Sequence, residues 1–218
     1  MTASSNNKNS GRTYAGLTSE QRKQDRYNQF LKAALETFGT TGFRTATVRG
    51  LCKQAKLTDR YFYESFASLE ELLMAIYERC MKDLKIHILT AIKTEYAKTN
   101  AEKAIVAGLD AYFNVLENNQ IARICMIELE GVSDEVNRLY YGYINDFSKT
   151  MVSLANHAYP NWNIDPQQKL VLAISLVGAM RQTATNCLIS NQSFNRKTLV
   201  DSTSTLFLGV LQMIGENA

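Results

Sequence analysis

The scarcity of proline constrains this chain more than any other sequence feature. Only Pro160 and Pro166 occur among 218 residues. Proline is the residue that a helix interior tolerates least, so long proline-free segments can remain helical. Apolar residues recur at helical spacing, as in the segment 27–38, and no stretch alternates convincingly with period two. The sequence therefore predicts an all-α protein.

The capping residues and turn residues predict where about nine helices begin and end. Thr18-Ser-Glu-Gln21 and Ser68-Leu-Glu-Glu71 fit capping boxes, and Thr47 and Thr58 are plausible N-caps of two short helices. The first helix is expected to end near Gly39. Beyond the long helix from Ser68, we predict helices at 101–118, 120–130, 134–158, 166–190 and 196–215.

Composition and cysteine usage exclude several classes of protein. Hydrophobic residues make up 45% and charged residues 21%, which is typical of a globular protein. The longest apolar run, "LVLAISLVGAM", stops at Arg181, short of the roughly 20 residues that span a bilayer. The polar N-terminus does not resemble a secretory signal, so a cytoplasmic location without membrane attachment is expected. Four scattered cysteines and two histidines predict no metal site and no disulfide framework.

Charge is unevenly distributed along the chain. Residues 1–66 contain eleven Lys and Arg against five Asp and Glu, a net charge of +6, whereas the remainder of the chain carries −3. A basic N-terminal part joined to a mildly acidic remainder favours an N-terminal part that binds a polyanion.

The segment "LTDRYFYESF" places three aromatic residues in a row beside an arginine. Two short helices with about three residues between them have the spacing of a helix-turn-helix, although an ordinary helical corner would look similar. Phe62 and Phe66, four positions apart, are expected to pack inward, which turns Tyr61 and Tyr63 toward the surface. Hydroxyls and cations beside them are the usual phosphate partners on DNA.

The stretch "GFRTATVRGLCKQAKLTDRYFYESFASLEELL" resembles the N-terminal domain of TetR-type transcriptional regulators, with a match from about Tyr27 to Ile76. The resemblance implies a homodimer that places two recognition helices in successive major grooves of double-stranded DNA. By similarity, Thr47, Thr58 and Tyr63 should contact phosphates. The remaining expected DNA-binding residues are Arg49 at a phosphate or base edge, Arg60 and Tyr61 in the groove, and Val48 and Asp59.

Two residues depart from the pattern of that family, and Asp59 has two readings. Lys56 replaces a turn glycine, so either the turn is strained or the loop has a different conformation. Leu69 replaces a lysine that normally meets phosphate, which removes one charge contact. For Asp59, we favour an interaction with the helix dipole over contact with a cytosine.

The resemblance also implies an effector pocket in the larger, C-terminal domain, although plain core packing is an alternative for every aromatic residue there. An apolar cavity with a few polar groups is what a small-molecule site requires. The ligand itself is unknown. The candidate effector-binding residues are Tyr112, Phe113, Met126, Tyr140, Tyr143, Phe147 and Trp162.

The last two predicted helices, 166–190 and 196–215, read as a dimer interface, with burial inside a monomer as the alternative. The contacting residues were expected to include Leu170, Ala173, Ile174, Val177, Met180, Leu199, Thr203, Leu206, Val210 and Ile214, with Gly178 and Gly209 permitting close approach. Four such helices from two subunits would form a bundle.

The sequence thus predicts a flexible arm at 1–18, a helix-turn-helix domain at 19–66, and an effector-binding and dimerisation domain at 67–218. We expect a homodimeric regulator, most simply a repressor released from a near-palindromic operator by a small molecule. An effector-free DNA-binding structural or cell-division protein of the same fold is the alternative. No enzyme motif and no cofactor motif is present in the sequence.

Overall fold

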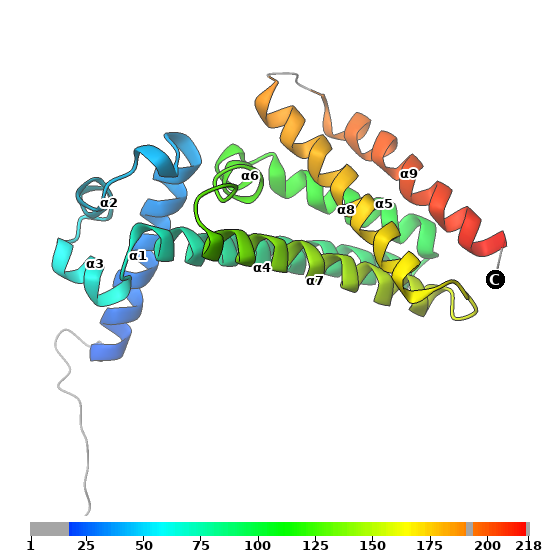
Figure 1. The fold of residues 1–218 in the computed structure, drawn as a ribbon, viewed down its shortest axis with the longest axis horizontal. Coiled ribbons are helices and arrows are strands. Elements are labelled where there is room, and N and C mark those ends of the chain that lie inside the picture. The colour runs from blue at the N-terminus through cyan, green and yellow to red at the C-terminus, as the bar shows by residue number, and fades with distance from the viewer. Residues whose placement is uncertain (1–17, 191–193, 217–218) are drawn as a thin grey trace, which may run out of the picture.

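The computed structural model describes residues 18–190 and 194–216, and this part of the chain is entirely helical (Figure 1). The predicted arm lies outside the described residues apart from Thr18. The helices in chain order are α1 (Ser19–Thr40), the 3-10 turn η1 (Phe43–Thr45), α2 (Val48–Ala55), α3 (Asp59–Ser65), α4 (Leu69–Tyr96), α5 (Ala101–Leu116), α6 (Asn119–Met126), α7 (Asp134–Ala158), α8 (Pro166–Ile189) and α9 (Arg196–Glu216).

We call residues 18–66, which contain α1 to α3, the head, and the described residues from 67 onward the body. Figure 1 shows the head at one end of an elongated molecule and α8 and α9 along the outside of the body. The head closes around Phe30, whose ring meets Phe62 and Phe66 edge-on at centroid distances of 5.4 and 6.2 Å. Three aromatic rings in mutual contact give this small unit a core that its short helices could not form separately.

Helix α4 begins directly after the head and runs the length of the body. The Ser68 hydroxyl accepts the Glu71 amide at 3.1 Å, as a capping box requires. The Glu71 carboxylate, however, accepts the amide of Ala67 rather than that of Ser68. Leu72, Leu73 and Ile76 on α4 are buried in the same hydrophobic core as Phe30. The core is therefore continuous from head to body, and the boundary at residue 66 stays a prediction.

The body is a bundle in which α5 packs along α4, α8 along α7, and α9 against α5. Three of these helices have side-chain caps at their N-termini: Asn100, Ser133 and Asp165 each accept backbone amides of the first turn. Tyr77, Ile124, Leu129 and Val136 lie in its fully buried centre.

Two helices end where head and body touch, and only one of these ends differs from its prediction. Helix α1 ends at Thr40, next to the predicted Gly39, and Gly39 allows a close approach: a Cβ there would lie 2.5 Å from the Gln120 Cβ on α6. Helix α6 ends at Met126 rather than near 130. The chain turns there so that Leu129 enters the core and Glu128 bonds to the head, and Gly131 follows with a φ of 74°.

None of the described helices is long and apolar enough to cross a membrane. In the same residues, no group of three or more His, Cys, Asp and Glu side chains is placed to hold a metal ion.

Candidate nucleic-acid interface and a second, apolar site

The start of α2 presents polar side chains to solvent. Thr47 is the N-cap, and its Oγ1 accepts the Gly50 amide at 3.1 Å. The Thr47 hydroxyl can still donate its hydrogen outward. Arg49 is exposed beside it, whereas Val48 is half-buried against the head's core. Val48 can therefore offer only part of its side chain to a partner, and Arg49 carries the charge at this end.

The turn between α2 and α3 contains the one non-glycine residue with positive φ in the described chain. Lys56 adopts φ 56° and ψ 38°, the left-handed conformation that normally favours glycine. The Leu57 amide donates to the Cys52 carbonyl at 2.9 Å and closes the turn. Of the two outcomes expected for Lys56, the strained turn is therefore the one that is found: Lys56 adopts the conformation in which glycine is usual. Its side chain is exposed.

Helix α3 separates its aromatic residues between core and surface. Phe62 is fully buried, and Phe66 at its C-cap is nearly so. Tyr63 is 62% exposed and rests the edge of its ring on Phe62, with the two planes at 87°. The prediction that Phe62 is core and Tyr63 faces outward is confirmed. Thr58 occupies the N-cap position, but its side chain makes no capping hydrogen bond, so the expected side-chain cap was wrong.

Tyr61 is half-buried rather than fully exposed, which corrects its expected position. The Arg26 guanidinium of α1 lies 4.5 Å from the centre of the Tyr61 ring. Arg26 also pairs with Glu64 at 3.7 Å, and Arg60 Nε donates to Glu64 at 3.0 Å. The Arg60 side chain nevertheless remains 84% exposed, so this pair engages the guanidinium only through Nε and leaves most of it in solvent.

Asp59 opens α3 and stabilises the helix by placing a negative charge at its positive end. It also lies within hydrogen-bonding reach of the buried Cys52. Burial raises the pKa of the Cys52 thiol to about 11, and the hydrogen bond with Asp59 adds to the rise. Leu69, the other residue that departs from the expected pattern, packs half-buried against the core and offers no charge.

A large apolar cavity lies in the body between α4, α5, α7, α8 and α9. Its volume is about 580 Å³, within the range of small-molecule sites. Apolar side chains dominate its wall: Ile88 and Ile92 come from α4, Leu109 from α5, and Met180 from α8. Small residues on α5, Ala104 and Gly108, leave space beside them. Such a cavity can accept a long apolar group.

The cavity has one polar end, at the tip of the body farthest from the head. Basic side chains from α4, α7 and α8 line it there: Lys93, His157 and Lys169. No Asp or Glu belongs to the described lining. Lys169 Nζ donates to the Trp162 carbonyl at 2.7 Å and to Asn156 Oδ1 at 2.8 Å, and lies 4.6 Å from the centre of the Trp162 ring. An ammonium group has three donors, so one remains for an anion.

Only two of the seven candidate effector-binding residues, Phe147 and Trp162, line this cavity. Tyr143 lies half-buried beside Tyr77, with centroids 5.4 Å apart. The others pack in the buried core around α6 instead: Tyr112, Phe113, Met126 and Tyr140. The Tyr112 hydroxyl donates to the Met126 sulfur at 3.7 Å, so even its polar end is satisfied internally. Sequence reasoning missed Lys169, whose position follows from the approach of α8 to Trp162.

Helices α8 and α9 each carry an exposed stripe on their outer side. On α8 it includes Val171, at 61% exposure, Ile174 and Gly178; on α9 it includes Leu206, at 53%, and Gly209. A Cβ added at Gly178 or Gly209 would meet nothing within 4 Å. Several residues expected to face outward are buried in the subunit instead: Ala173, Val177, Met180, Thr203 and Ile214.

The comparisons with known proteins agree with this architecture. The model of the TetR family of bacterial regulatory proteins matches residues 30–76, from the core of α1 into α4. The fatty acid metabolism regulator protein of Bacillus subtilis (strain 168) is 21% identical over 194 residues, which cover 86% of this chain and 96% of that protein.

Two solved structures have a similar fold. The FadR regulator of Bacillus subtilis in complex with stearoyl-CoA has a TM-score of 0.69 at 18% identity, covering 88% of this chain and 99% of that one. The fatty acid degradation regulator FadR of Bacillus halodurans has a TM-score of 0.67 at 19% identity, covering 84% and 95%. These relatives are regulators rather than enzymes. The helix-turn-helix geometry of the head, the match of the family model to residues 30–76 and the likeness to these regulators together support a TetR-family transcriptional regulator.

Proposed function

We propose that the protein is a homodimeric repressor whose two heads bind a near-palindromic operator and are released when an anionic, long-chain effector fills the body cavity. The single observation that supports this most strongly is the pairing of two sites in one chain. A capped, cationic helix pair lies at one end, and an apolar cavity with a basic rim lies at the other.

In the proposed complex, α3 enters the major groove of DNA. Arg60 is the residue best placed to read a base, because its exposed guanidinium matches the paired acceptors of guanine. Tyr63, Thr47 and Thr58 hold phosphates through their hydroxyls, and Arg49 adds a phosphate or base contact. Tyr61, held by Arg26, and the half-buried Val48 line the groove, while Asp59 stabilises α3.

The dimer forms through the exposed stripes of α8 and α9. A monomer would leave Val171, Ile174 and Leu206 in water, whereas a four-helix bundle with a second copy buries them. The open Gly178 and Gly209 allow the backbones to approach closely. Two-fold symmetry would then place the two recognition helices about 34 Å apart, one turn of DNA.

The lining of the cavity supports the class of effector. A long apolar chain fits the wall of α4, α5, α8 and α9, and the basic rim at Lys93, His157 and Lys169 favours a negative group at its end. Stearoyl-CoA, which the Bacillus subtilis FadR structure contains, has both features. We therefore propose a long-chain acyl thioester or the corresponding fatty acid. The presence of this cavity favours an effector-controlled regulator over an effector-free structural protein.

The test uses an operator selected from random duplex DNA with the wild-type protein. Stearoyl-CoA should lower operator affinity of the wild type, and coenzyme A alone should not. Lys169→Met should weaken stearoyl-CoA binding about tenfold, the size expected for one charge-assisted hydrogen bond, and leave octadecanol binding unchanged. Calorimetry measures the ligands and fluorescence anisotropy measures the DNA.

Lys103→Met is the matched control, because Lys103 lies on α5 outside the cavity lining and the substitution removes the same charge. An operator affinity that ignores stearoyl-CoA would remove acyl thioesters from the proposal. Equal loss of stearoyl-CoA binding in the two variants would remove Lys169 from the rim.

A further inference from the structure

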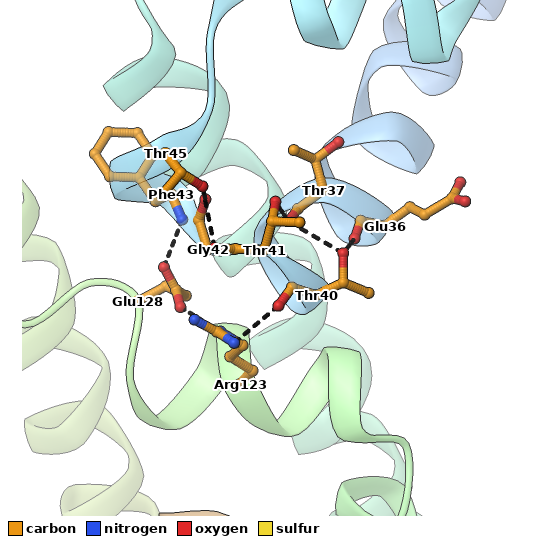
Figure 2. A network of polar contacts seen from close by, with 9 residues as sticks. All are labelled: Glu36, Thr37, Thr40, Thr41, Gly42, Phe43, Thr45, Arg123 and Glu128. Carbon is orange, nitrogen blue, oxygen red and sulfur yellow. Dashed lines mark hydrogen bonds and ion pairs between the residues drawn. The ribbon is translucent and has the colours of Figure 1, made fainter.

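Helix α6 is bonded to the head at one point and to the cavity-forming helix α8 at another. On the head side, Glu128 just beyond α6 is 6% exposed, and its Oε2 accepts the Phe43 amide at 2.6 Å (Figure 2). Its Oε1 accepts Arg123 Nε at 2.5 Å, and Arg123 NH1 donates to the Thr40 carbonyl at 2.9 Å. We call Arg123 and Glu128 the latch.

The latch satisfies backbone groups that the head leaves open. The Thr40 carbonyl is at the C-terminal end of α1, where carbonyls lack helical partners and the helix dipole favours a cation. The Phe43 amide begins η1 and likewise has no partner within that turn. The head therefore depends on two side chains of the body to complete its own hydrogen bonding.

Head and body approach each other closely at two glycines beside the latch, Gly39 and Gly42. A Cβ at Gly39 would lie 2.5 Å from the Gln120 Cβ and 2.7 Å from its Cα, and one at Gly42 would lie 2.8 Å from Arg123 NH2. Gly42 also has a φ of 92°, which only glycine adopts readily. Contact this close transmits a displacement of α6 to the head instead of absorbing it.

The other contact joins the same short helix to the wall of the cavity. Arg181 on α8 donates from NH2 to the carbonyl of Met126, the last residue of α6, at 3.0 Å. Its guanidinium also lies 4.9 Å from the centre of the Tyr140 ring. The preceding residue, Met180, lines the cavity. A ligand that displaces this part of α8 must therefore move Arg181, and Arg181 holds the end of α6.

We propose that the latch holds the head in its DNA-binding orientation, and that Arg181 lets an occupant of the cavity loosen it. Arg123, Glu128 and Arg181 are positioning residues: they touch neither DNA nor the cavity occupant. The response to a ligand rests on the proposed function, whereas the latch itself is a property of the ligand-free protein. Occupancy then shifts the population toward a state with the latch open.

The experiment compares Glu128→Gln and Arg123→Gln with Glu135→Gln, a matched control that removes an exposed carboxylate of α7. Arg123→Lys should have an effect between those of the wild type and Arg123→Gln. Its ammonium group keeps the charge but does not reproduce the fork of donors that reaches both Glu128 and Thr40. Thermal unfolding identifies variants that fail to fold, and Arg123 is the milder site since it is 36% exposed.

Three quantities are measured for each folded variant: hydrogen exchange around Phe43, operator affinity, and the ratio of operator affinities without and with stearoyl-CoA. In both glutamine variants, exchange around Phe43 should accelerate at least about tenfold, while the amides of α2 and α3 keep their protection. Operator affinity should fall about tenfold and the ratio should approach one, within the size of typical allosteric couplings. Stearoyl-CoA should bind the glutamine variants at least as tightly as the wild type, because the open state that it favours is already populated.

Failure of this inference is distinguishable from failure of the proposed effector. If the wild type ignores stearoyl-CoA, the effector class is wrong, and exchange and operator affinity still decide the latch. If the glutamine variants match Glu135→Gln in both of those measurements, the latch does not position the head. If they bind operator more weakly but keep the full wild-type ratio, the latch is structural and the proposed coupling is overturned.

Discussion

The exposed surface of the head is built on short helices, whereas the cavity of the body lies mainly between long ones. The head packs the eight-residue α2 and the seven-residue α3 on a small aromatic core and turns Arg60 and Tyr63 outward. The body uses helices of up to 28 residues and encloses a volume between them. The proposed DNA recognition by the head therefore depends on a few protruding side chains, whereas the proposed effector recognition by the body depends on the space that long helices leave.

The same difference decides how well the spacing of residues in the sequence reveals which way a side chain faces. On α3, the spacing of Phe62 and Tyr63 reveals which of them points to the core and which to solvent. A residue of α8 can face the cavity, as Met180 does, or the outer stripe, as Ile174 does, and both positions are apolar. Three predictions follow from this contrast between head and body.

The largest effect is expected from Gly178→Arg on the outer stripe of α8. An arginine at the centre of the proposed four-helix interface would bury a charge without a partner, so the protein should become monomeric. Operator affinity should then fall by at least about a hundredfold, because two linked heads gain that much from binding together. Light scattering after size-exclusion chromatography and anisotropy with operator DNA measure the two effects.

Gly142→Arg on α7 is the matched control, since a side chain there also meets nothing within 4 Å. It should remain dimeric and bind operator normally. A dimeric Gly178→Arg protein would show that the body associates through another surface, and the contrast between the two faces of α8 would lose its functional meaning.

A smaller effect is expected in the head from Arg60→Ala. Loss of one bidentate base contact costs about 1–3 kcal/mol per site, so operator affinity should fall while binding to unrelated DNA changes little. Tyr63→Phe removes a hydroxyl assigned to phosphate and should weaken both kinds of DNA equally. Titrations with operator and scrambled duplex distinguish them; an Arg60→Ala protein with full discrimination would remove Arg60 from the reading residues.

The smallest effect is a loss of folding stability at alkaline pH. It arises from buried ionisable groups in both head and body. Burial raises the pKa of the Cys52 thiol in the head from 9.0 to about 11, and it raises the pKa of Tyr77 and Tyr112 in the body above their usual 10.0. These groups stay protonated in the folded chain while the unfolded chain ionises. Their contribution to stability is therefore complete below about pH 9 and is lost as pH rises through the folded values.

Tm should thus decline by a few degrees between neutral pH and about pH 10.5. Circular dichroism during heating measures this decline. Cys52→Ala should reduce the part of the decline that begins near pH 9. The part caused by the body tyrosines should remain, as should the part caused by the Cys125 and Cys187 thiols, whose pKa values are also raised in the folded chain. A Tm that stays level throughout this range would contradict the prediction.

Local patterns were sufficient for most of the head. The spacing of Phe62 and Phe66 predicted which ring is buried, and Thr18, Thr47 and Ser68 predicted where helices begin, because capping and helical periodicity act over a few residues. Tyr61 was placed wrongly, since its burial comes from Arg26, which is distant in sequence.

The body resisted such reasoning because aromatic residues look alike whether they fill a core or line a cavity. Tyr112 and Met126 satisfy each other inside the core, and that pairing appears only when α5 meets α6. The basic rim depends on Lys93, His157 and Lys169 arriving from three helices at one end of the bundle. Nothing in their sequence spacing indicates this.

From the order of its residues alone, the chain specified helices, several of their capped starts, the burial of Phe62 with the exposure of Tyr63, and a resemblance to a family of regulators. Tertiary structure alone decided which face of α8 borders the cavity, where the cavity acquires its positive charge, and how Arg123 and Glu128 join body to head. The physical reason is range. Caps and helical faces are set by neighbours within about four residues, whereas a cavity and a latch exist only between segments that folding brings together.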